Sequence, residues 1–309
     1  MGCLRSGEPV DIARKTFNAF RRNSSAISFV ILVGFLVMMF SVGYHILAYD
    51  SSEFLQEPKA QEYENSIGEV VAMDEWERTK YYWSHNLRLA GLYVVTTPSY
   101  LSFHSSVFNG YSVGVATSYW YHDGGADANA ALAFLAGIFV HGVLELTGAF
   151  ILAGATLRAA WNFWKGAGHM AFMTGENEKT WSWRLSRRER KELRKYRGKV
   201  KGFLADFIIL VGFGAFLIFL AGPIEVYVSP SVMAVFHTSP PLAVAFLVAI
   251  ALIYISVFFL WFGGLRALGR DFRLMRRDIG DAFKLKWRST HLSLLVFVAF
   301  SIFAAILLL

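Results

Sequence analysis

Long hydrophobic runs separated by short polar segments dominate the pattern of this chain. The runs cover residues 26–48, 129–161, 203–228, 242–262 and 292–309. A helix as long as the first run rises by about 34 Å, which is enough to cross the hydrocarbon core of a bilayer. The pattern therefore predicts an all-α fold, a polytopic bundle of membrane helices.

Residues 87–122 form a less regular hydrophobic stretch. The stretch is too long for one upright span and too short for two generous ones, and it contains Pro98 and the pair Asn109-Gly110. Such residues are typical of turns and helix ends. We expect a hairpin or a broken helix within the region 87–161, formed by 87–122 and followed by one span. In the alternative, the helix breaks at His141-Gly142 and 129–161 forms the hairpin.

Composition supports the membrane class. The chain has 309 residues, of which 55% are hydrophobic, and a mean hydropathy of +0.42. Ordinary soluble domains rarely carry so much apolar content in such long runs, so a soluble fold is excluded. Cys3 is the only cysteine, and therefore no internal disulfide can form.

Charge predicts the orientation of the bundle. Residues 49–84 contain nine acidic and three basic side chains, whereas 165–201 contain twelve basic and four acidic ones and 266–288 eight and three. Because cytoplasmic loops are enriched in Lys and Arg, we expect both basic loops and the tail 1–25 in the cytoplasm and the acidic segment outside. These positions require about seven crossings of the cell membrane, with the N-terminus cytoplasmic and the C-terminus outside.

The run 129–161 carries two polar side chains that a lipid-facing helix would not keep. His141 and Glu145 lie four residues apart and therefore share one helix face. A Glu at mid-membrane costs about 2.5–3.5 kcal/mol, so it should face protein or a water cavity. Asn86 and Asn109 are candidate hydrogen-bond partners within this buried polar centre. Small residues permit close helix packing, and the candidate positions are Gly110, Gly114, Gly142, Gly148 and Gly154.

Three interpretations of this pair remain open. His141 and Glu145 could satisfy each other and fix helix register, line a route for an ion, a proton or a polar headgroup, or bind a metal. The metal interpretation is the weakest because no second histidine stands at i+4 and no H-E-x-x-H motif is present. We therefore expect no metal, no cofactor and no catalytic residue, and hence no enzyme.

Two further acids lie in or near the hydrophobic runs. Glu225 is flanked by Pro223 and Pro230 and is expected either to reach headgroup water or to form a second polar position with Glu145. Asp206 follows the basic loop and is expected to form a salt bridge at the membrane interface.

The pattern of residues 76–86 predicts an amphipathic helix that lies on the outer surface.

Several motifs together resemble the stage II sporulation protein M family of integral membrane proteins. They are "WSHNLRLA" with Asn86, "FNGYSVGV" with Asn109 and Gly110, "HGVLELTGAFILAGATLR" with His141 and Glu145, and "GPIEVYVSPSVM" with Glu225. The resemblance covers 26–233 as one membrane core and leaves 234–309 as a two-span extension. The chain departs from the family pattern at Gly148, where members often have Pro.

The resemblance implies a role in the cell envelope. In sporulating bacteria the family member is similar to a membrane anchor that holds peptidoglycan-degrading partners. The expected function is thus a scaffold, a homo-oligomer in contact with membrane lipids, that assembles envelope or cytoplasmic proteins for membrane or wall remodelling. Nucleic acid is not an expected partner, since the basic charges adjoin the spans. A transporter, channel or lipid-translocating protein that uses His141 and Glu145 is the alternative.

Overall fold

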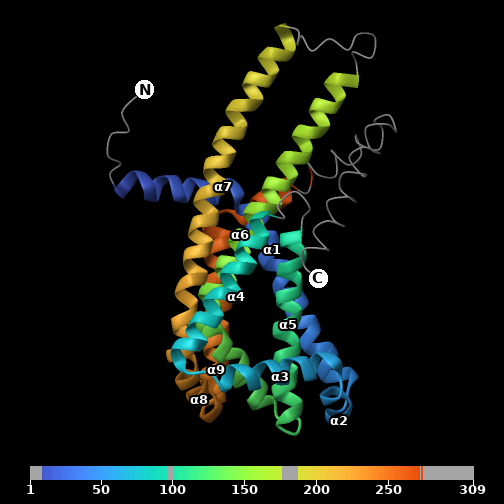
Figure 1. Ribbon diagram of the computed structural model, residues 1–309, viewed down its shortest axis with the longest axis vertical. Helices are drawn as coiled ribbons and strands as arrows, with labels where there is room; N and C mark the ends of the chain where they lie inside the picture. The colour runs from blue at the N-terminus through green and yellow to red at the C-terminus, as the bar shows by residue number, and fades with distance from the viewer. Residues whose placement is uncertain (1–8, 96–100, 176–186, 272, 274–309) are drawn as a thin grey trace.

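The computed structural model describes residues 9–95, 101–175, 187–271 and 273, and the helices in these ranges form one elongated bundle (Figure 1). The described residues contain helices and no strand. The labelled helices are α1 (Pro9–Ala48), α2 (Ser51–Leu55), α3 (Pro58–Val71), α4 (Glu75–Val95), α5 (Leu101–Asp123), α6 (Ala128–Gly175), α7 (Arg187–Tyr227), α8 (Ser229–Thr238), α9 (Pro240–Tyr254) and the π-helix η2 (Ile255–Trp261). Residues 264–271 are also helical.

Four stretches within these helices are long and apolar enough to cross a membrane. They are Ile12–Ala48, Ala128–Asn162, Gly202–Tyr227 and Pro240–Trp261. Each contains or nearly coincides with a predicted hydrophobic run, which confirms the helical membrane class. The predicted run 292–309 lies outside the described residues, and the number of seven crossings stays a prediction.

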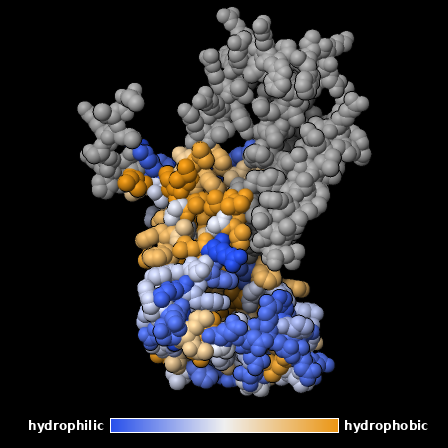
Figure 2. Space-filling model, viewed as in Figure 1, coloured by the Kyte–Doolittle hydropathy of each residue, from blue (hydrophilic) through white to orange (hydrophobic). Residues whose placement is uncertain are grey.

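The two ends of the bundle differ in chemistry. Helices α2 and α3 and the 124–127 turn lie at one end, called the acidic end here (Figure 1). At the other, called the basic end, α6 and α7 project beyond the rest of the bundle as two neighbouring helices. Figure 2 shows the acidic end covered by hydrophilic residues and a hydrophobic belt beside it. This division matches a membrane protein with one polar cap and one projecting arm.

A helical hairpin forms where the sequence is least regular. Helix α4 runs from the acidic end into the bundle and α5 returns to that end, with Pro98 in the connection 96–100 (Figure 1). Helix α5 continues without a break through Asn109-Gly110. Helix α6 likewise continues through His141-Gly142, so the alternative that breaks the chain there is wrong.

Helix α4 does not lie on the outer surface, and that prediction is wrong. Thr79, Asn86, Ala90 and Tyr93 are buried on one of its faces. Trp83 stacks on Phe219 of α7, with ring centroids 4.6 Å apart, and donates its indole N–H to the Phe219 carbonyl. The acidic first turn and the exposed Trp76 and Tyr81 resemble a surface helix, but Trp83 packs on α7. Helix α3 is the one that lies across the acidic end (Figure 1).

The helices approach closely where glycine removes the side chain. A Cβ on Gly148 of α6 would lie 2.5 Å from the Gly214 carbonyl oxygen of α7, and one on Gly154 would lie 2.6 Å from Ile27 Cα of α1. Gly110 and Gly114 of α5 meet α1 in the same way, at Gly34 and Ser41. Gly142 differs, because a Cβ there would meet only side chains of its own helix, at 3.4 Å or more. The prediction of close packing at Gly142 is therefore not met.

Ion pairs connect α1 to neighbouring helices at the basic end. The guanidinium of Arg22 donates two hydrogen bonds to Asp206 of α7, at 2.6 and 2.5 Å. This contact confirms Asp206 as a salt-bridge partner. Asp271 accepts from Arg158 of α6 at 3.2 Å and from Ser25 of α1 at 2.5 Å. The segment predicted as a cytoplasmic tail, residues 1–25, is helical from Pro9 and packs against other helices from Ala19 onward.

Candidate functional site: a buried His-Glu-Glu cluster

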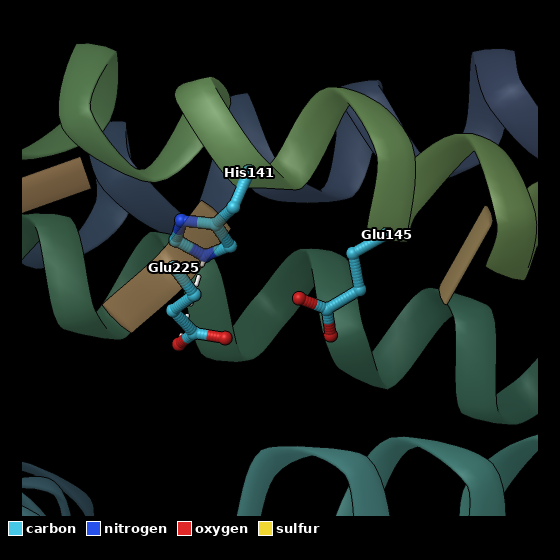
Figure 3. A group of neighbouring side chains, drawn as sticks. All are labelled: His141, Glu145 and Glu225. Carbon is cyan, nitrogen blue, oxygen red and sulfur yellow. Dashed lines mark ion pairs between the residues drawn. The ribbon is translucent and has the colours of Figure 1, made fainter. Parts of the chain in front are cut away.

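The candidate site lies on α6, the helix in the middle of the bundle. Glu145 stands seventeen residues from each end of the apolar stretch Ala128–Asn162, and His141 stands one turn closer to the acidic end. Both side chains point away from α6 toward α7, where Glu225 approaches them (Figure 3). The site therefore joins two helices at a depth where water is scarce.

Three potential ligand groups converge there. One ligand atom from each of His141, Glu145 and Glu225 lies within 4.8 Å of the other two. His141 Nε2 is 3.7 Å from Glu225 Oε1, and the two side chains are only 11% and 17% exposed. Both side chains lie largely within the bundle, and the cluster places Glu225 beside Glu145, as the second interpretation of Glu225 expected.

The junction between α7 and α8 orients the imidazole. The Ser229 hydroxyl donates to the Ile224 carbonyl at 3.2 Å and lies 2.9 Å from His141 Nδ1. When Ser229 donates to this carbonyl, its oxygen is free to accept the N–H of His141 Nδ1. In that tautomer Nε2, which faces Glu225, keeps a lone pair.

The Glu225 carboxylate is incompletely satisfied. Its Oε2 is buried and has no hydrogen-bond partner among the described residues. The phenol of Tyr82 on α4 lies beside this carboxylate. A buried anionic oxygen without a partner is costly, and such an atom in a folded protein calls for an explanation by a proton, an ion or water.

The two asparagines border the cluster without joining it. Asn86 of α4, Asn109 of α5 and Glu145 line one cavity of about 10 Å³, which is room for about one water molecule. Asn109 donates to the Tyr93 hydroxyl at 3.2 Å. Around Glu145, the five residues of the predicted polar centre thus gather from four helices.

Ser229 and Tyr82 were not among the residues selected from the sequence. Ser229 had a usable signal, because it follows Glu225 by four residues and so falls on the same helical face. Tyr82 had no such signal, since only the packing of α4 on α7 brings it to Glu225. In one of the three interpretations His141 and Glu145 satisfy each other. Among the described residues, the polar contacts of His141 are with Ser229 and Glu225.

Comparison with known proteins identifies the family. The family model of Stage II sporulation protein M matches residues 27–230, about two thirds of the chain. The chain belongs to this family. Comparisons with curated proteins and with solved structures give no match. All of His141, Glu145 and Glu225 fall inside the matched segment, and most of α8 and all of α9 fall outside it.

Proposed function

We propose that this Stage II sporulation protein M family member is a multi-pass scaffold of the cell membrane, without catalytic activity, that assembles partner proteins for envelope remodelling. The observation that carries the proposal is the arm at the basic end. The arm consists of residues 163–175 of α6 and 187–201 of α7, and residues 187–201 form the charged start of α7, ahead of its apolar stretch (Figure 1). At 1.5 Å per residue, the fifteen residues 187–201 span about 20 Å of helix.

The arm has the chemistry of a docking element. Residues 187–201 contain nine Lys or Arg and two Glu. A projecting helix with this many positive charges attracts an acidic protein surface. Because both helices of the arm continue from membrane spans, the arm would hold a bound partner at a fixed distance from the membrane. At the opposite end, exposed Glu62 and Glu69 share one face of α3 and offer a second surface. A homo-oligomer would multiply both surfaces.

The test removes charge from the arm alone. In the variant, Arg187, Arg188, Arg190 and Lys191 are replaced by Gln; in the control, exposed Lys59 and Lys80 at the acidic end are replaced in the same way. Partners crosslinked in intact cells are quantified by mass spectrometry. We expect the arm variant to lose captured partners by about tenfold or more, since a few ion pairs together supply more than 1.4 kcal/mol. Equal capture by both variants would reject the proposal.

The buried cluster favours a second candidate function, transport of an ion, a proton or a lipid headgroup. Acids at mid-membrane mark such pathways, and the cavity beside Glu145 lies next to the cluster. Glu145→Gln separates the two functions. A scaffold with this substitution keeps its captured partners, whereas a carrier that folds normally loses flux in reconstituted vesicles.

A further inference from the structure

We propose that His141, Glu145 and Glu225 bind one divalent first-row transition metal ion, such as Zn²⁺ or Mn²⁺, that links α6 to the junction of α7 and α8. This site is independent of the scaffold proposal. The expectation from sequence was that no metal binds, because no second histidine follows His141 at i+4. The third ligand comes instead from another helix, 80 residues further along the chain.

The spacing of the ligand atoms suits one ion. Zinc–nitrogen and zinc–oxygen bonds are about 2.0–2.2 Å long, so two ligand atoms of one ion lie about 3–4 Å apart. The 3.7 Å between His141 Nε2 and Glu225 Oε1 already falls in this range. The largest separation within the cluster is at most 4.8 Å, so binding one ion requires only a small movement of the ligand side chains. The three protein ligands leave a fourth position open.

The hydrogen bonds around His141 prepare the imidazole for a metal. A metal-binding histidine usually donates its other N–H to a nearby acceptor, which fixes the tautomer and the ring. Ser229 supplies that acceptor at 2.9 Å from Nδ1. In the Nδ1-H tautomer, Nε2 keeps a lone pair and faces Glu225 Oε1 at 3.7 Å, so a cation between these two atoms could bind both.

Charge balance points to a divalent ion. Two ionised carboxylates and a neutral imidazole carry a charge of −2, which a bilayer interior disfavours. A divalent cation neutralises the cluster and also provides a partner for the buried Oε2 of Glu225. The mixture of one nitrogen and several oxygen donors selects zinc, manganese or iron over magnesium and calcium, which prefer oxygen donors alone. A cavity of about 10 Å³ lined by Glu145, Asn86 and Asn109 has room for one water molecule on the Glu145 side of the cluster.

The test titrates the purified full chain in detergent, with any affinity tag removed and after treatment with a chelator. Co²⁺ is the probe, because its visible spectrum reports nitrogen and oxygen ligation, and Zn²⁺ is added as the competitor. We expect binding that saturates at one Co²⁺ per chain and is displaced by Zn²⁺. Glu225→Gln and His141→Gln should each weaken Co²⁺ binding by at least tenfold, whereas Glu69→Gln on the exposed face of α3 should not change it.

Three results would overturn the site. The first is wild-type protein that shows no saturable Co²⁺, Zn²⁺ or Mn²⁺ binding, which would leave a shared proton as the neutralising charge. The second is equal binding by Glu225→Gln and wild type. The third is equal loss in Glu69→Gln. If size-exclusion chromatography shows that either cluster variant aggregates, Glu145→Gln is used in its place. The wild-type titration alone decides whether the chain binds a metal ion.

Discussion

At the scale of single residues, buried polar side chains depend on partners contributed by distant parts of the chain. Asp206 is almost fully buried, and its two hydrogen bonds come from Arg22, which lies 184 residues earlier. The sequence indicated that Asp206 needs a cation because the residue borders a basic loop. The packing of α1 against α7 decided which cation it binds. Several Lys and Arg of the loop lie nearer to Asp206 in the sequence than Arg22 does.

Asp206→Asn should lower the free energy of unfolding by about 1–2 kcal/mol, because it removes a bidentate, charge-assisted interaction. The loss is limited by Arg22, whose side chain is 59% exposed and can return to water. Thermal unfolding in detergent measures the change. The control is Glu62→Gln, which removes an exposed pair with Lys59 and should change stability by less than about 0.5 kcal/mol. Equal shifts for the two variants would contradict a special role of Asp206.

At the scale of helices, contacts through glycine position α6 in the middle of the bundle. Gly148 and Gly214 lie against each other's carbonyl oxygens, at 2.5 and 2.8 Å from the Cβ position that each lacks. The sequence predicted close approach at Gly148 without naming the partner helix. It also predicted the same at Gly142, where none occurs. Small residues in the sequence show where another helix could pack closely. The positions of the neighbouring helices determine at which of these residues close packing occurs.

Gly148→Ala should destabilise the bundle by about 2 kcal/mol or more, since the new Cβ overlaps a backbone oxygen that cannot move without shifting α7. Gly212→Ala is the matched control, on α7 and two residues from Gly214. A Cβ at Gly212 meets no atom within 4 Å, and Ala favours the helix over Gly by up to about 1 kcal/mol. Thermal unfolding should therefore shift down for Gly148→Ala and remain equal or rise for Gly212→Ala. The opposite order would show that α6 and α7 are less tightly packed.

At the scale of the whole molecule, the hydrophobic belt, the acidic end and the projecting arm support a proposed orientation in the membrane. The bundle places α3 and the arm at opposite ends (Figure 1), and the positive-inside rule assigns the arm to the cytoplasm. The rule and the bundle are independent, because one uses loop charge and the other uses helix packing. The proposed topology, with the N-terminus cytoplasmic, follows when they are combined.

Single cysteines should reveal this orientation in intact cells. In a Cys3→Ser background, Glu69→Cys on α3 should react with a membrane-impermeant maleimide added outside. Lys195→Cys on the arm should react only after the membrane is made permeable. Both variants should label fully in detergent, which controls for burial. Labelling of Lys195→Cys in intact cells would reverse the orientation and move the proposed arm partners to the outside.

Features that are local in the chain follow from its amino-acid sequence alone. Hydropathy averaged over about 20 residues decides whether a segment enters a membrane, so the four apolar stretches followed from sequence, and Pro98 marked the connection between α4 and α5. The shared face of His141 and Glu145 followed from 3.6 residues per turn. Features that join distant segments depend on the packing of the helices: α4 lies beside α7, each glycine faces a particular helix, and Glu225 and Ser229 lie next to His141. The way two helices cross depends on the shapes of all the side chains that face each other. A local sequence pattern does not contain that information.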